Sequence, residues 1–131
     1  MSQHILQTML QKINITVVNK NGFSDFVARA NNAVVFFAEN PERYPETADV
    51  ACVLPEILKA FPTLEAALVS EPDQHELQRG FDFTKWPTLA FFHRGNYRGA
   101  ISGIRNWDEY QQLIPTLLEG NSTQAIPVLN L

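Results

Sequence analysis

The stretch that decides the fold covers residues 33–58 and has the sequence AVVFFAENPERYPETADVACVLPEIL. Its first part, residues 33–38, is apolar without alternation, which is typical of a central strand covered by helices on both faces. A polar loop with two prolines follows over residues 39–48, and a helix is predicted over residues 49–60. That helix contains Pro55, and an interior proline removes a backbone hydrogen bond and bends a helix. The stretch therefore predicts a buried strand that leads into a bent helix.

Apolar periodicity predicts further strands and helices on both sides of this stretch. In chain order they are a helix over 4–11, a strand over 13–18, a helix over 23–30 after a break at residues 21–22, a strand over 66–69, a helix over 72–79, a strand over 88–93, its hairpin partner over 98–102 and a helix over 107–118. Asn106, with Glu109 three residues on, is typical of a capping box at the start of the last helix. The alternation predicts parallel strands joined by right-handed crossovers, and thus a mixed α/β sandwich.

Length, charge and cysteine content exclude several classes of protein. A chain of 131 residues suits one domain, expected over residues 1–120, with residues 121–131 as a flexible C-terminal tail. The net charge of −4 and the absence of a basic stripe argue against nucleic acid as a partner. No apolar run reaches the roughly 18 residues of a membrane span, and the N-terminus lacks a signal-peptide pattern, so the expected location is the cytoplasm. The single cysteine, Cys52, cannot form an internal disulfide.

Three motifs give the chain a resemblance to a known fold. They are VVFFAE at residues 34–39, ahead of the helix with Pro55, WPT at residues 86–88, and the hairpin sequence RGNYRG at residues 94–99. This arrangement resembles the thioredoxin fold, a three-layer α/β/α sandwich with a mixed central sheet. The segment WPTLAFFHRGNYRGAISGIRNW, residues 86–107, is similar to the HyaE/HupG family of hydrogenase-operon proteins, and the likeness covers nearly the whole chain.

This resemblance implies a function and a partner. It implies a thioredoxin-like protein without the redox motif, which assists the maturation of nickel–iron uptake hydrogenases as a chaperone. The implied partner is the precursor of the hydrogenase small subunit, whose twin-arginine signal peptide is expected to be bound before export. Other hydrogenase maturation proteins are further partners that the resemblance suggests, and no cofactor is expected.

The chemistry of thioredoxins is missing from this chain. Dithiol exchange needs a Cys-x-x-Cys at a helix N-terminus, where the helix dipole stabilises a thiolate and the second thiol resolves the mixed disulfide. Counted back from Pro55, these positions fall on Thr47 and Val50. Matching VVFFAE to the central strand of thioredoxins places Val35 where they carry a buried acid. We therefore predict that the protein is not an enzyme.

The other residues with reactive side chains are predicted to be structural. Cys52 lies beyond the first helical turn among apolar neighbours, which predicts a small buried hydrophobe. The alternative, a single-cysteine redox protein acting through Cys52, requires an exposed thiol with a cationic neighbour. His4, His75 and His93 lack metal-ligand spacing, so no metal site is expected.

The candidate binding surface is the backbone beside Trp86 and Pro87. The thioredoxin resemblance implies a cis peptide there, and in relatives the residue before the proline pairs with an extended peptide by β-augmentation, which needs no sulfur. The opposite wall is expected to be the loop and helix start over residues 39–56, which carry five acidic residues against one cation, Arg43. Carboxylates match the guanidinium groups of a twin-arginine segment bidentately. The candidate residues are Glu39, Glu42, Glu46, Asp49, Trp86 and Pro87. The alternative for the acidic residues is a solvated loop beside a helix start.

A basic segment supports a third hypothesis. Residues 79–105 carry five Lys or Arg residues against Asp82. If they share one face, the protein is a scaffold that docks hydrogenase subunits or maturation proteins there. Arg94 and Arg98, in the predicted hairpin, are the residues that this hypothesis requires at the surface.

Overall fold

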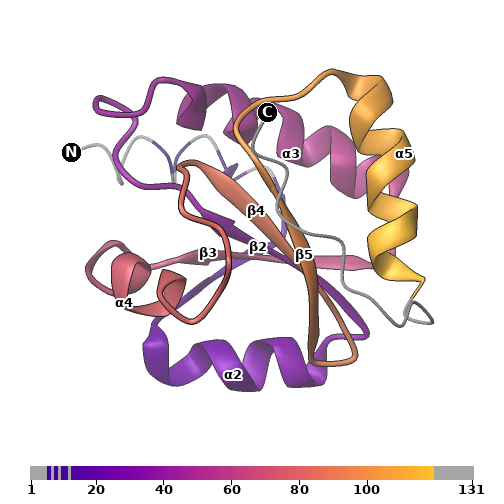
Figure 1. Ribbon diagram of the computed structural model, residues 1–131, viewed down its shortest axis with the longest axis horizontal. Helices are drawn as coiled ribbons and strands as arrows, with labels where there is room; N and C mark the ends of the chain where they lie inside the picture. The colour runs from indigo at the N-terminus through magenta and orange to yellow at the C-terminus, as the bar shows by residue number, and fades with distance from the viewer. Residues whose placement is uncertain (1–5, 7, 9, 12, 120–131) are drawn as a thin grey trace.

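A five-stranded sheet lies between helices in the computed structural model, which describes residues 6, 8, 10, 11 and 13–119 (Figure 1). The strands are β1 (Ile15–Val18), β2 (Asn32–Phe37), β3 (Leu64–Val69), β4 (Thr88–His93) and β5 (Asn96–Ser102). The helices are α2 (Lys20–Arg29), α3 (Glu46–Ala60), the 3-10 helix η1 (Glu71–Asp73), α4 (Gln74–Gln78) and α5 (Trp107–Leu118).

The sheet has the order β1-β3-β2-β4-β5 and is mixed. β3 pairs in parallel with β1 and with β2. The chain runs from β1 to β2 through α2 and from β2 to β3 through α3, and helical crossovers of this kind join parallel strands. β4 pairs antiparallel with β2, and β5 returns along β4 through a turn at Arg94 and Gly95, whose φ angles are 51° and 84°. Positive φ at both central residues is typical of a tight hairpin turn. The predicted mixed sheet and its hairpin are confirmed.

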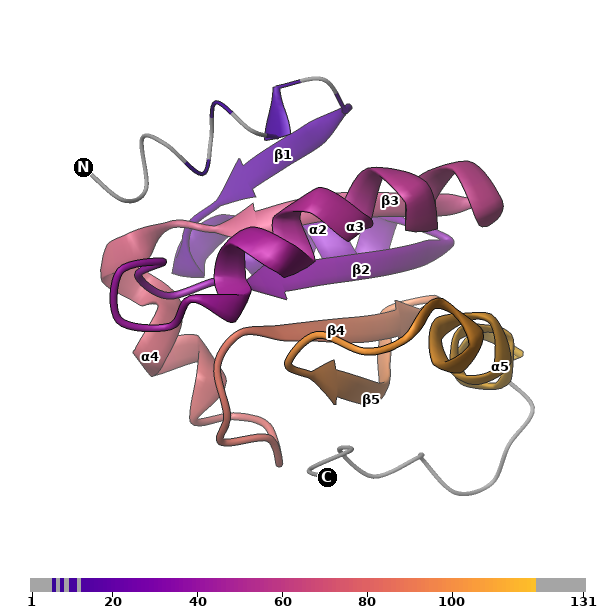
Figure 2. The same ribbon diagram turned by 90° about the horizontal axis from the view of Figure 1, so that it is seen from above.

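β2 is buried on both faces, and its residues divide the core in two. Val34 and Phe36 pack with α3 and α5, whereas Val35 and Phe37 pack with α2 on the opposite face of the sheet. This division follows from the two-residue period of a strand. Figure 2 shows α3 on one side of the sheet and α2 behind it on the other. The predicted three-layer α/β/α sandwich is confirmed.

α2 begins before the predicted position. The expected break at residues 21–22 is wrong, because Asn19 caps the helix: its side chain accepts hydrogen bonds from Asn21 N (3.0 Å) and Gly22 N (2.8 Å). These two residues therefore lie in the first turn of α2. An N-cap side chain supplies the acceptor that the first backbone N–H groups lack.

α3 also begins earlier, at Glu46 rather than residue 49. The Thr47 hydroxyl donates to the Ala38 carbonyl at 2.6 Å, which fastens the first helical turn to the end of β2. Acidic residues in that turn are favourable at a helix N-terminus. Further on, β3 starts at Leu64, and the helix predicted over 72–79 is divided between η1 and α4. The capping box of α5 is present as predicted.

Both ends of the chain extend beyond the described residues. Leu6, Thr8 and Leu10 have helical conformation, and the two leucines are fully buried in the core. The rest of the helix predicted over 4–11 lies outside the described residues, as does the tail over 121–131. Among the helices that the structure describes, none has the length and apolar character to span a bilayer.

Candidate functional site

The two helix positions at which thioredoxin chemistry needs thiols are closed to solvent. Thr47 has 0% exposure and donates its hydroxyl to Ala38, while Val50 packs in the core at 1% exposure. Val35, at the position of the buried acid, is also in the core. The start of α3 thus holds neither an attacking thiol nor a resolving thiol.

Cys52 is exposed, so the prediction of a buried hydrophobe is wrong. Ala51 and Leu54 take the core-facing side of α3, and the helical rotation of about 100° per residue turns Cys52 away from them. Apolar neighbours in sequence therefore do not imply an apolar environment. Cys52 lines a hollow of about 820 Å³ with Pro55 and residues of β1 and β3.

The Trp86–Pro87 peptide bond is cis, as predicted. Pro87 is buried, and its carbonyl accepts a hydrogen bond from Gly103 N at 2.7 Å, which continues the pairing of β4 with β5 beyond Thr88 and Ser102. Trp86 is half-buried. Beside it lies a hollow of about 230 Å³, the Trp86 groove, lined by Glu46, Lys85, Trp86 and residues 102–105.

Glu46 crosses from the start of α3 to the far wall of the Trp86 groove. Its Oε1 accepts a hydrogen bond from Ile104 N at 2.8 Å. Gly103 permits this approach, because a Cβ there would lie 2.8 Å from the same oxygen, and its φ of 73° is one that side chains disfavour. Arg105 N donates to the Tyr110 hydroxyl at 3.2 Å, and burial raises the pKa of that tyrosine, so its hydroxyl is neutral.

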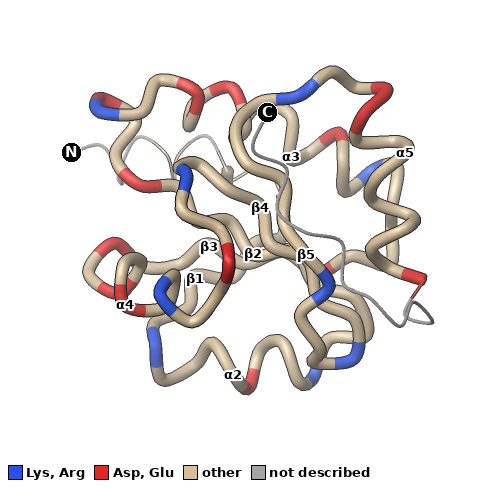
Figure 3. The backbone as a smooth tube through the Cα atoms, in the orientation of Figure 1, with Lys and Arg blue, Asp and Glu red and all other residues tan. Residues whose placement is uncertain are grey.

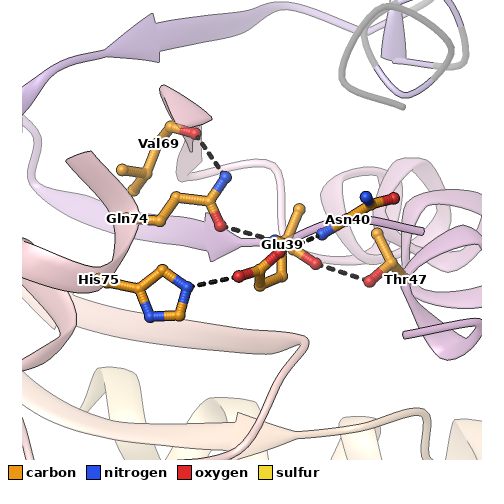
Figure 4. A network of polar contacts seen from close by, with 7 residues as sticks. Glu39, Asn40, Thr47, Val69, Gln74 and His75 are labelled. Atoms are coloured by element: carbon orange, nitrogen blue, oxygen red, sulfur yellow. Dashed lines mark hydrogen bonds and ion pairs between the residues drawn. The ribbon is translucent and has the colours of Figure 1, made fainter. Parts of the chain in front are cut away.

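A second set of polar contacts, the Glu39 network, joins the ends of β2 and β3 to α4 (Figure 4). Gln74, only 1% exposed, accepts from Glu39 N at 2.6 Å and donates to the Val69 carbonyl at 3.4 Å. The Glu39 side chain accepts from Asn40 N at 2.7 Å and pairs with His75 Nε2. Glu39 has a φ of 56°, which lies in the left-handed region, and the hydrogen bonds of its backbone N–H and side chain hold it in this conformation.

These partners set the charge of Glu39. Burial pushes its pKa upward, but the hydrogen bonds from His75 and Asn40 N and the positive charges of His75 and Arg43 outweigh burial, so the pKa of Glu39 is lowered. The His75 ring also packs on Trp86, with ring centroids 4.6 Å apart. Trp86 therefore contacts the Glu39 network and lines the groove that Glu46 crosses.

The structure brings together only part of the predicted acidic wall. Glu46 and Trp86 line the same groove, and Pro87 is hydrogen-bonded through its carbonyl to Gly103 N in the groove wall. Glu39 instead lines a neighbouring hollow of about 270 Å³. The other two candidates, Glu42 and Asp49, are exposed and line neither hollow. Figure 3 shows Asp and Glu positions along the loop before α3 and at the start of that helix.

Sequence reasoning missed Gly103, Ile104, Gln74 and His75. Gly103 carried the one usable signal, because a glycine directly after a strand often marks positive φ or a close backbone approach. Its neighbour Glu46 is distant in the sequence, so the contact was not predictable. The two α4 residues gave no signal, because their partners lie at the end of β2.

The basic segment does not form one surface. Arg98 is only 9% exposed and its Nε donates to the Leu117 carbonyl at 3.1 Å, whereas Arg94 is exposed at the hairpin turn. Figure 3 shows Lys and Arg spread over several elements. The scaffold hypothesis is wrong in placing Arg98 at a docking face. Within the described part of the chain, no three His, Cys, Asp or Glu residues are placed to hold a metal ion.

Comparison with known proteins relates nearly the whole chain to hydrogenase expression proteins. The family described as "Hydrogenase-1 expression protein HyaE" matches residues 5–110. The hydrogenase expression/formation protein HoxO of Azotobacter vinelandii is 36% identical over 128 residues, which cover 96% of this chain and 86% of that protein.

Solved structures of a HupG protein and of a thioredoxin are similar to this chain. The HupG structure from Rhodopseudomonas palustris CGA009 matches with a TM-score of 0.56 and 35% identity over 78% of this chain and 93% of that chain. A thioredoxin of Plasmodium falciparum matches with a TM-score of 0.63 and 19% identity over 77% of this chain and 97% of its own. This second likeness concerns the fold alone, and the predicted thioredoxin-like fold is confirmed.

Proposed function

This chain belongs to the HyaE family of hydrogenase expression proteins, and from that premise we propose that it is a non-catalytic, peptide-binding chaperone. It is an accessory protein of hydrogenase expression and formation with a thioredoxin-like fold. The proposed client is the precursor of the small subunit of a nickel–iron uptake hydrogenase. The protein binds the twin-arginine signal peptide of that precursor in the cytoplasm before export.

The observation that carries this proposal is a groove without thiols. No hydrogen bond joins the backbone of Trp86 to another described residue, and its indole forms part of the groove wall. An extended peptide that pairs with this backbone gains main-chain hydrogen bonds and side-chain contact with the indole. Because Thr47 and Val50 are buried and lack sulfur, they cannot form a disulfide with such a peptide, and the peptide is released without covalent change.

Charge supports a cationic client. The protein carries a net charge of −4, which speeds encounter with a positive peptide. At the groove itself Glu46 supplies a carboxylate. Guanidinium pairs with carboxylate through two parallel hydrogen bonds, whereas an ammonium acts as a point charge.

Isothermal calorimetry with the synthetic signal peptide of the hydrogenase small subunit tests the proposal. We expect the peptide to bind, and a version with Lys-Lys in place of Arg-Arg to bind about tenfold more weakly, since one bidentate contact is lost. Mass spectrometry after incubation should show an unchanged peptide. Equal affinity for a scrambled peptide, or no binding at all, contradicts the proposal.

A further inference from the structure

Three successive backbone N–H groups beside the Trp86 groove have partners of different kinds. Gly103 N is held by the carbonyl of buried Pro87, and Arg105 N is held by the hydroxyl of Tyr110, which has 0% exposure. Ile104 N, between them, is held by the carboxylate of Glu46, an exposed side chain. Only the Ile104 donor can therefore be released by a side-chain rotation, without movement of the backbone or core.

The Glu46 carboxylate holds the Ile104 N–H and therefore competes with any carbonyl that approaches this donor. Its Oε1 lies 2.8 Å from Ile104 N, which is the distance of a backbone carbonyl in a strand pair. A charged acceptor binds an N–H more strongly than a neutral carbonyl does. A peptide that offers only carbonyl oxygens is thus a poor competitor for this donor.

Among the described residues that line the groove, Glu46 is the only carboxylate. Lys85 and Arg105 line it as well, so the local charge as a whole does not favour a cationic side chain. Glu39 is not available to such a side chain, because His75 and Asn40 N hold its oxygens. Selection for arginine at this groove therefore depends on Glu46.

We propose that Glu46 couples the recognition of charge to backbone pairing, an inference that rests on the proposed function. A guanidinium of the client pairs with the Glu46 carboxylate and draws it away from Ile104. The freed N–H then binds a carbonyl of the client, beside the backbone of Trp86. A client with arginine thus favours the open groove, and a neutral client leaves the groove closed, since a ligand shifts an equilibrium only by its differential affinity for the two states.

Two variants of Glu46 and one control separate this coupling from simple attraction. Glu46→Gln keeps an amide oxygen for Ile104 N but removes the charge, whereas Glu46→Ala removes both. Glu42→Gln removes an exposed charge from the preceding loop, away from the groove. The probes are a synthetic peptide with an Arg-Arg pair before an apolar stretch and its Gln-Gln counterpart, measured by calorimetry.

The proposal predicts a different response of each variant. Wild type binds the Arg-Arg peptide about tenfold more tightly than the Gln-Gln peptide, and Glu46→Gln loses about tenfold in affinity for the Arg-Arg peptide. Glu46→Ala binds the Gln-Gln peptide more tightly than wild type does and no longer distinguishes the two. Glu42→Gln behaves as wild type. The Ile104 amide resonance of the wild type shifts when the Arg-Arg peptide binds.

The outcomes also separate this inference from the proposed function. If wild type binds the Arg-Arg peptide while the Ile104 resonance stays in place and Glu46→Gln matches Glu42→Gln, the coupling is overturned and peptide binding stands. If wild type binds neither peptide, the proposed function is overturned and the coupling with it. Should Glu46→Ala fail to fold, Glu46→Gln and the Ile104 resonance still decide.

Discussion

Glu39 and Glu46 stand at the two ends of the loop that leads from β2 to α3, and their surroundings differ. The Glu39 side chain is 12% exposed and has His75 and Asn40 N as partners, while Gln74 holds its backbone N–H. The Glu46 side chain is exposed, and its Oε1 accepts a hydrogen bond from Ile104 N. The carboxylate of Glu39 supports the structure, whereas the carboxylate of Glu46 is available to a ligand.

The hydrogen-bond partners of an acidic residue, more than its charge, therefore decide its role in this protein. Glu39 lies where β2 and β3 end side by side, so backbone groups and α4 side chains converge on it. Glu46 lies on the first turn of a helix that faces a hollow. Substitutions at Gln74, Gly103, Glu39 and Cys52 are expected to change stability by successively smaller amounts.

Gln74→Leu breaks the Glu39 network and should have the largest effect. Leucine is of similar size but leaves Glu39 N and the Val69 carbonyl without partners. We expect the free energy of unfolding to fall by about 2–3 kcal/mol, because buried polar groups without partners are costly. Urea unfolding measures this change. Gln111→Leu, on the exposed face of α5, is the control and should stay within about 0.5 kcal/mol of wild type.

Gly103→Ala acts at the other carboxylate. A side chain at a φ of 73° costs about 1–2 kcal/mol, and the new Cβ would press on Glu46 Oε1. We expect lower stability in urea and faster hydrogen exchange of the Ile104 amide. Gly22→Ala is the matched control, because its Cβ meets ordinary contacts inside α2, and it should raise stability by about 0.5–1 kcal/mol. Slower or unchanged exchange at Ile104 would contradict the contact.

Glu39→Gln tests, through the pH dependence of stability, what the ionised Glu39 carboxylate contributes to the fold. Because the pKa of Glu39 is lowered from 4.5 in the folded state, its ionised form stabilises the fold above that value, and this contribution is lost as pH falls through the folded pKa. Glu39→Gln should be less stable than wild type by about 1 kcal/mol near neutral pH. The gap should narrow below about pH 4.5. Urea unfolding over a pH series measures it, and a gap that stays constant would refute the assigned cause.

Cys52→Ala should have the smallest effect. The side chain is exposed on α3, so we expect stability within about 0.5 kcal/mol of wild type and unchanged affinity for the Arg-Arg peptide. A thiol reagent should modify Cys52 in the native protein without prior denaturation. Loss of peptide binding in Cys52→Ala would instead favour the single-cysteine alternative.

Most of the fold was predictable because it depends on local patterns. The apolar run of β2, the hairpin before α5 and the capping box at Asn106 each identify an element from adjacent residues. The boundaries that were wrong depend on single side-chain contacts. Asn19 extends α2 toward the N-terminus, and the bond from Thr47 to Ala38 does the same for α3.

The candidate site was predicted less well than the fold. Of the candidate residues, Trp86 and Glu46 line one groove and Pro87 bonds to Gly103 in its wall, whereas Glu42 and Asp49 do not line it. The apolar neighbours of Cys52 predict a core position, but helix rotation turns its side chain outward. Acidic composition alone did not show which carboxylate faces the groove.

Residue types in order are enough to establish that the start of α3 has no dithiol chemistry, because no folding can supply a sulfur that Thr47 and Val50 lack. They also establish the layered α/β architecture, since periodicity is a local property of the chain. The roles of Glu39 and Glu46 arise only on folding. Their partners, Gln74 and Ile104, come from segments far along the chain, and a hydrogen bond forms only between groups that the fold brings within about 3 Å.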